Sequence, residues 1–295
     1  MKFNSDQPKI IVVGSSSIDL VLNVPKYPAQ NETIMATKVE SYFGGKGANQ
    51  AVACSRLGAS VYFVGAVGMD PLGQQVLRNL IDEGVNVGFV HECTESATGA
   101  AYVTAAENRN AIVVVPAANA QLNKSHVEAV EKYFETADLI LIQLEIPMET
   151  VEFTIELAKK YNVEVGLYAA PAEKLSEELI NDLSFVVAKS SELETIFGTG
   201  AKDEILHRFP NKLFIRDDAN STTYFDGTEM RYQRDHNSEI VYTMGMGDAF
   251  VAGFSIAMCH QNSIEDCVNF GNAVSFKVSE ERGSQKGLPK LADIS

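Results

Sequence analysis

Tryptophan is absent from this 295-residue chain, and cysteine and histidine are scarce, with four and five residues respectively. The cysteines form no C-x-x-C pair and the histidines show no ligand spacing. These absences exclude the usual cysteine- and histidine-based metal or redox motifs. We expect the thiols to be buried and reduced, as in a cytoplasmic protein.

Positive charge is also in short supply, with 24 Lys and Arg against 39 Asp and Glu, a net charge of −15. Nucleic acid and anionic membranes are therefore not expected partners, and an anionic substrate would need a local basic pocket. No apolar stretch approaches the length of a membrane span. The first residues are polar and 10–13 is only a strand-sized run, so we expect no secretory signal and a cytoplasmic location.

What the chain does contain is an alternation of strand and helix patterns, and 45% of its residues are hydrophobic. Strands are predicted at 9–14, 60–66, 138–144, 163–168, 184–188 and 212–216. Helices are predicted at 48–57, 71–83, 123–135, 149–161, 191–197, 247–260 and 264–280. This order predicts an α/β fold with a doubly wound, mainly parallel sheet flanked by helices.

Two stretches, 20–43 and 98–116, contain strand patterns without helices between them. The strand patterns lie at 21–24, 33–36, 100–103 and 111–115. We expect them to form a small separate sheet appended to a single domain of residues 1–295. No low-complexity linker or internal repeat argues for a further division.

Residues 242–250 (YTMGMGDAF) predict a strand, a tight glycine turn and the start of a helix. The free N–H groups at such a helix start attract anions. Asp248 lies in the same turn, where it is suited to deprotonate a hydroxyl while the N–H groups take the developing charge. Taken alone, the segment fits equally well a structural turn with an acidic first-turn residue.

A second glycine-rich turn, at residues 41–50 (SYFGGKGANQ), also leads into a predicted helix. Gly44, Gly45 and Gly47 permit close approach of a ligand to the backbone. Lys46 and Asn49 add hydrogen-bond donors. The spacing matches neither a Walker loop nor the dinucleotide-binding pattern, and the alternative is a solvated turn with a surface lysine.

Asp19, the 44–49 turn, Glu145 and Asp248 all follow predicted strands. In a parallel α/β sheet, ligands bind beyond the carboxyl ends of the strands. We therefore expect these residues to meet in one crevice, although Asp19 alone fits a turn and Glu145 alone fits a helix entry.

The sequence resembles the ribokinase-like carbohydrate kinase family almost from end to end. Residues 43–53 (FGGKGANQAVA) match the first signature of that family and 245–250 (GMGDAF) match the second. Further similar segments are 13–21 (VGSSSIDLV), 67–73 (VGMDPLG), 98–101 (TGAA), 107–110 (ENRN), 118–120 (ANA), 143–147 (QLEIP) and 283–289.

This resemblance implies a doubly wound sheet with a β-sheet lid, formed by about 18–44 and 98–116, and a homodimer through the lids. It implies transfer of phosphate from ATP, with Mg²⁺, to a hydroxymethyl group of a small sugar, ribose being the expected one. Asp248 would be the base, and the N–H groups of Gly245, Met246 and Gly247 would form the anion hole. The sugar-binding positions would be Ser17, Asp19, Gly44, Gly45, Lys46, Asn49 and Glu145, and Glu192 would help to organise the metal.

The nucleotide positions implied by the resemblance carry unusual residues. Lys189 stands where the family has Asn, and residues 215–221 (IRDDANS) replace a Thr-x-Gly-x-x-Gly loop, which places Asp217 and Asp218 near the expected triphosphate. Lys189 or Arg216 is a candidate to compensate this charge, and Asn272 completes the nucleotide set. Further replacements are Ser17 for Asn, Tyr168-Ala169 for Asn-Pro, and Tyr242 for the Asp that usually supports a monovalent cation.

Three functions remain open from the sequence. The first is an active sugar kinase with an altered nucleotide site, which the retained Asp248 favours. The second is a kinase-like sugar-binding or sensor protein with weak or no transfer, which the altered glycine loop favours. The third is a kinase for a nucleoside or fructose.

Overall fold

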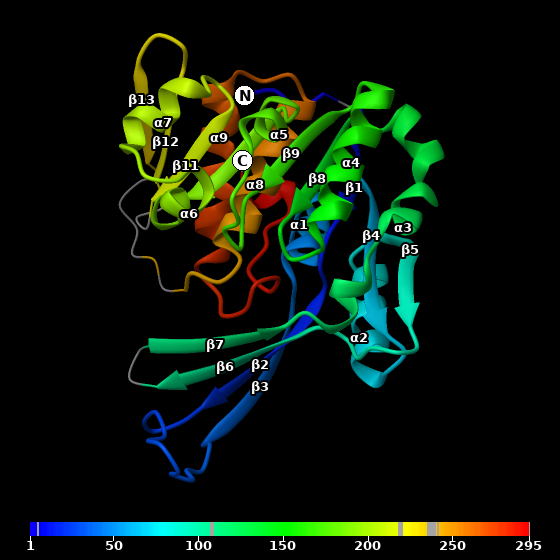
Figure 1. Cartoon of the computed structure of the whole chain (residues 1–295), viewed down its shortest axis with the longest axis vertical. Coiled ribbons are helices and arrows are strands. Elements are labelled where there is room, and N and C mark those ends of the chain that lie inside the picture. Colours follow the sequence, from blue (N-terminus) through cyan, green and yellow to red (C-terminus); the bar gives the residue numbers. More distant parts are fainter. Residues whose placement is uncertain (5, 107–108, 218–220, 235–239, 241, 295) are drawn as a thin grey trace.

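The computed structural model describes residues 1–295 apart from 5, 107–108, 218–220, 235–239, 241 and 295. Within the described residues, the strands form one sheet of nine strands, in the order β13-β12-β11-β10-β9-β8-β1-β4-β5, and one of four, in the order β3-β2-β6-β7 (Figure 1). The larger sheet consists of β1 (Lys9–Val13), β4 (Ser60–Gly68), β5 (Asn86–Cys93), β8 (Leu139–Gln143), β9 (Glu164–Tyr168), β10 (Phe185–Lys189), β11 (Leu213–Asp217), β12 (Ser221–Phe225) and β13 (Met230–Arg234).

The seven strands from β5 to β11 pair in parallel, and β12 and β13 extend the sheet with antiparallel pairing, β13 forming the edge. The central strands are short and apolar, and every residue of β8 is buried. Such continuous apolar strands are typical of a parallel sheet that is covered on both faces.

Side chains of one strand alternate between two hydrophobic clusters on opposite faces of the sheet. Ile10 and Val12 belong to one cluster, and Ile11 and Val13 to the other. The first cluster includes residues of α1 (Lys46–Arg56), α2 (Pro71–Asp82), α8 (Met246–Cys259) and α9 (Ile264–Val278). The second includes residues of α3 (Lys124–Glu128), α4 (Met148–Tyr161), α5 (Glu177–Asn181), α6 (Leu193–Phe197) and α7 (Lys202–Arg208).

This architecture confirms the predicted doubly wound α/β fold, with three local corrections. The strand predicted at the start of residues 242–250 is a loop, because none of the described residues between β13 and α8 is in a strand. The predicted helix 123–135 is divided into α3 and a 3-10 helix at Glu131–Thr136. The apolar residues Val127, Val130 and Phe134 are buried in this arrangement as well, because their spacing also suits the tighter turns of a 3-10 helix. The predicted strand at 33–36 is a loop in which Met35 is 83% exposed, and β3 follows it. The strands β5, β12 and β13 and the helices α5 and α7 were not predicted.

The smaller sheet contains β2 (Ser17–Asn23), β3 (Lys38–Gly44), β6 (Ala100–Ala106) and β7 (Arg109–Val115). It projects from the body of the molecule at one end of the large sheet (Figure 1). Because β2 follows β1 after three residues, its first residues lie at the carboxyl end of the central strand. The pairing of Ser17 with Gly44 brings the start of β2 to the first glycine-rich turn. Among the described residues, no helix combines the length and apolar character that crossing a bilayer would require.

Candidate active site

A cavity of about 760 Å³ lies between the carboxyl ends of the large sheet and the inner side of the small sheet. Its polar lining includes Ser17, Asp19, Lys46, Asn49, Glu145, Tyr168, Lys189, Glu192, Asp248 and Ser284. Its apolar lining includes Ala101, Val103, Ile112 and Val114, which come from β6 and β7 of the small sheet. The structure thus brings together side chains that are more than 200 residues apart in the sequence.

Asp248 is the third residue of α8, whose first turn faces the cavity. The helix begins after Gly245, which has a φ of 79°, and a Cβ atom at that position would lie 2.6 Å from the carbonyl oxygen of Ser284. Glycine is required there because other residues rarely adopt this left-handed conformation. The turn therefore presents unsatisfied backbone N–H groups beside a carboxylate.

The carboxylate of Asp248 is buried and held by two amides. Asn49 Nδ2 donates to Oδ2 at 2.9 Å, and Gln50 Nε2 donates to Oδ1 at 3.2 Å. The amide of Gln50 is itself held, because Gln143 Nε2 donates to its oxygen at 2.6 Å. Burial raises the pKa of Asp248 to about 6, against the opposing effects of Lys46 and the two amides.

Lys46 and Glu145 form an ion pair in the cavity, with 3.6 Å between Nζ and Oε1. The backbone N–H of Lys46 and the hydroxyl of Ser15 also donate to Glu145, at 3.0 and 2.5 Å. Burial alone would lower the pKa of Lys46, but the nearby carboxylates of Glu145 and Asp248 raise it overall. Lys46 is therefore a permanent positive charge beside the buried acid.

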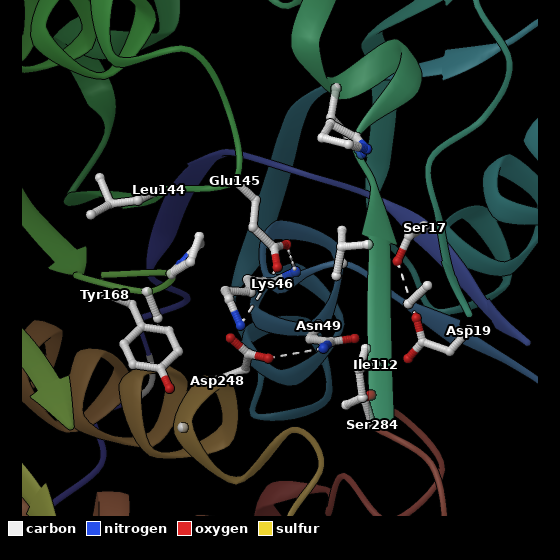
Figure 2. Close-up of a pocket in the computed structure, with 18 of the residues that line it drawn as sticks. Ser17, Asp19, Lys46, Asn49, Ile112, Leu144, Glu145, Tyr168, Asp248 and Ser284 are labelled. Carbon is white, nitrogen blue, oxygen red and sulfur yellow. Dashed lines mark hydrogen bonds and ion pairs between the residues drawn. The ribbon is translucent and has the colours of Figure 1, made fainter. Parts of the chain in front are cut away.

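Asp19 lies on β2, on the small-sheet side of the cavity. Ser17 Oγ donates to its Oδ1 at 3.2 Å, and a Cβ atom on Gly44 would lie 2.3 Å from the same oxygen. Burial raises the pKa of Asp19 to about 6, with Glu145 adding to the effect and Ser17 and Lys46 opposing it. Figure 2 shows Lys46, Asn49 and Asp248 turned toward one space, with Tyr168 on one side and Asp19 on the other.

The predicted nucleotide residues are not all in this cavity. Lys189 and Glu192 line it, with 3.9 Å between Lys189 Nζ and Glu192 Oε1. Arg216 is only 6% exposed and lies against α8 and α9, where it bonds Asn272, Thr222 and Ser275 and stacks on the ring of Phe250. In the described structure Arg216 and Asn272 do not line the cavity, and Asp218 lies outside the described residues.

The negative charge expected near the nucleotide is partly neutralised. Lys202 Nζ contacts Asp217 Oδ2 at 3.0 Å, and the hydroxyl of Thr223 donates to the same oxygen at 3.1 Å. Tyr242 does not line this cavity but a second one, and its backbone N–H donates to the carbonyl of Ser279 at 3.1 Å.

Sequence reasoning missed several residues of the site. Gln50 lies next to Asn49 in a recognised motif, but only the structure shows that both amides bond the same carboxylate. Tyr168 was noted only as a replacement, although its position at the end of a predicted strand was a signal. Ser284 and β7 lie in segments that the sequence analysis named, the similar segment 283–289 and the expected lid 98–116, but no role for their individual side chains was predicted.

A metal that arrives with a phosphate ligand needs few protein ligands. No group of three or more His, Cys, Asp or Glu side chains in the described part of the chain is arranged to hold a metal ion by itself. Mg²⁺ is usually held by one or two carboxylates together with substrate phosphates and water. The partly exposed carboxylate of Glu192, at the cavity wall, fits that mode of binding.

Comparison with known proteins gives consistent matches over nearly the whole chain. The family model for pfkB family carbohydrate kinases matches residues 7–291. A ribokinase of Bacillus subtilis is 35% identical over 285 residues, which cover 97% of both chains, and one of Lactococcus lactis is 31% identical over 97% of this chain and 95% of its own. The structure of Arabidopsis thaliana ribokinase complexed with ribose and ATP superposes with a TM-score of 0.89 at 26% identity, over 98% of both chains. That of Thermotoga maritima ribokinase gives 0.86 at 27%, over 97% of both.

Proposed function

Because the chain belongs to the pfkB family of carbohydrate kinases, we propose that it transfers the terminal phosphoryl group of ATP to a hydroxymethyl group of ribose. The observation that carries the proposal is the position of Asp248. Its carboxylate shares one cavity with a set of polar side chains suited to sugar hydroxyls, and it lies in the first turn of a helix that points at the same space.

The sugar end of the cavity has the composition that a small polyol requires. Asp19, Asn49 and Glu145 offer carboxylate and amide groups for hydroxyls, while Lys46 supplies a fixed donor. Ser17, Gly44 and Gly45 complete this end through the start of β2 and the turn before α1. The apolar side chains of β6 and β7 cover it, and we assign the small sheet the role of a lid that excludes water.

The chemistry asked of this chain is positioning, proton removal and charge stabilisation. Asp248 removes the proton of the sugar hydroxyl, and Asn49 and Gln50 keep the carboxylate in one orientation. With a pKa of about 6, Asp248 is ionised at neutral pH and still basic enough to accept that proton. The N–H groups of Gly245, Met246 and Gly247 hold the negative charge of the phosphoryl group.

At the other end, Lys189 and Glu192 face the expected triphosphate. Mg²⁺, when bound with ATP, would neutralise part of the phosphate charge, and Glu192 is the residue that would help to hold the ion. Arg216 and Asn272 bond each other behind this end and fix β11 against α9, which supports the nucleotide site from within. Tyr242 carries no carboxylate, so we propose that the reaction does not depend on a monovalent cation.

The outer side of the small sheet carries exposed apolar side chains that are suited to an interface between two copies of the chain. Tyr102 and Val113 are paired across β6 and β7, and both side chains are exposed, as is Val39 on β3. Exposed apolar patches of this kind often mark interfaces. We propose a homodimer through the lids, and the free cysteines at all four positions are consistent with a reducing, cytoplasmic location.

A coupled assay of ADP release across pentoses, hexoses and nucleosides tests the proposed function. We expect ribose to give the highest kcat/KM, and a preference for a nucleoside or fructose would correct the substrate. Thermal shifts with ribose and, separately, with MgATP complete the test. A ribose shift without ADP release would indicate instead the sugar-binding protein that the altered 215–221 segment favours.

A further inference from the structure

Tyr168 places a phenol group where the cavity meets the first turn of α8. It is the last residue of β9, between Gln143 of β8 and Val187 of β10, at the carboxyl end of the parallel sheet. The residue is only 2% exposed, yet it lines the cavity. Its hydroxyl makes no hydrogen bond to any described residue and is not one of the fully buried unpaired oxygens, so it is available to a group in the cavity.

The hydroxyl lies directly against the backbone of the glycine turn. A Cβ atom on Gly247 would be 2.1 Å from the hydroxyl oxygen, so the absence of a side chain at Gly247 leaves the space that this oxygen occupies. Figure 2 shows the ring of Tyr168 pointing toward the start of the helix that carries Asp248. Lys46 Nζ lies 5.7 Å from the centre of the same ring.

The hydroxyl of Tyr168 is protonated and can therefore donate a hydrogen bond. Burial raises the pKa of the Tyr168 hydroxyl further above its ordinary value, against the opposing effect of Lys46, so the phenol keeps its proton at any physiological pH. An unpartnered O–H beside the free N–H groups of a helix start and a lysine has one obvious partner, an anionic oxygen in the cavity.

We propose that Tyr168 is a further catalytic residue, whose hydroxyl donates a hydrogen bond to an oxygen of the phosphoryl group during transfer. This inference rests on the proposed function. In the step, Asp248 takes the proton of the sugar hydroxyl and the sugar oxygen forms the new bond to phosphorus. The bond from phosphorus to the bridging oxygen breaks, and ADP leaves with its electron pair. Tyr168 retains its own proton and stabilises the charge on the transferred group.

The competing explanation is that the ring of Tyr168 only fills space under α8. A phenylalanine would do this equally well, so Tyr168→Phe separates the two. We expect kcat to fall by about 10- to 100-fold, as for the loss of one oxyanion donor, while the Kd of ribose from calorimetry stays within about twofold. With ribose present, the affinity for ADP with fluoroaluminate, a mimic of the group in transfer, should fall by a similar factor.

Tyr224→Phe is the matched control, because Tyr224 is equally buried, packs on Phe214 and does not line the cavity. It should leave kcat unchanged. A Tyr168→Phe enzyme with the wild-type kcat would overturn the proposal, and so would a loss confined to ribose affinity. Absence of ADP release from the wild type would refute the proposed function itself, and this inference with it.

Discussion

The two ends of the cavity differ in where their polar and charged side chains point. At the sugar end, the polar side chains of Asp19, Asn49 and Lys46 face the cavity. At the proposed nucleotide end, two of the residues that replace the family pattern are bonded within the protein: Arg216 bonds Asn272, and Asp217 pairs with Lys202. A motif can therefore lose its usual residues while the charges of the replacing residues are neutralised or hydrogen-bonded within the protein. An altered sequence at this end is therefore weaker evidence against activity than each substitution suggests alone.

The largest effect should come from the acid between the two ends. Asp248→Asn removes the base while keeping the shape of the side chain, and we expect kcat to fall by about 10²- to 10⁴-fold. Ribose binding by calorimetry should persist, because the other sugar contacts are intact. Asp217→Asn, at a carboxylate outside the cavity, serves as the control and should lose far less. An Asp248→Asn enzyme that turns over normally would remove this residue from the mechanism.

At the nucleotide end, the largest effect should be on stability. Arg216→Met leaves the buried polar groups of Thr222, Asn272 and Ser275 without their hydrogen bonds to the guanidinium, and we expect a loss of about 3 kcal/mol in the free energy of unfolding. In a thermal melt of a chain of this length, this corresponds to a fall of about 5 °C in Tm. Arg208→Met, at an exposed pair with Glu177, should change the Tm little. Equal melts for the two variants would contradict the structural role of Arg216.

The sugar end should respond to acid. The pKa of both Asp19 and Asp248 is raised to about 6, so each carboxyl takes up a proton as the pH falls below 6. Because the base must be ionised, kcat/KM should fall by about tenfold per pH unit, and more steeply if both groups must be ionised. In the Asp19→Asn variant, kcat/KM should still fall at low pH, with the tenfold loss per pH unit expected for protonation of Asp248 alone. A profile that stays flat down to pH 5 would argue against both assignments.

A smaller effect is expected at the mouth of the nucleotide end. Lys189→Ala removes a partly exposed cation, and we expect the KM for ATP to rise by about two- to fivefold with the Kd of ribose unchanged. Lys174→Ala, outside the cavity lining, is the control. An unchanged KM for ATP would show that Lys189 does not compensate for the missing loop residues.

The smallest effect should follow replacement of the monovalent cation. Exchanging K⁺ for tetramethylammonium in the ADP-release assay should leave kcat/KM nearly unchanged, because Tyr242 offers no carboxylate and its N–H bonds Ser279. A strong dependence on K⁺ would show that backbone oxygens alone suffice to bind the ion.

The sequence predicted the fold class and most of the central strands because short apolar runs between helix patterns are specific to a covered parallel sheet. It missed β12 (STTYF) and β13 (MRYQR), whose sequences are rich in polar residues and of which β13 is the edge strand. It also missed the division of the helix at 123–135, because the spacing of Val127, Val130 and Phe134 suits both kinds of helix. It predicted that Asp19, Lys46, Glu145 and Asp248 meet, because each was expected to follow a strand. Lys46 and Glu145 do follow strands, whereas Asp19 lies within β2 and no described strand directly precedes Asp248. It did not predict the contact of Tyr168 with Gly247 or the inward turn of Arg216, because these depend on packing between distant elements.

The proposed sugar-binding residues are divided between the small sheet and the helices of the body, and this division has a consequence for how the site works. Ser17 and Asp19 belong to the projecting small sheet, whereas Lys46 and Asp248 belong to helices of the body. A swing of that sheet would carry half of the sugar contacts away from the base. Binding of the sugar and exclusion of water from the site would then occur in one step. When ATP is bound without a sugar, the site would be incomplete and would promote hydrolysis of ATP only weakly.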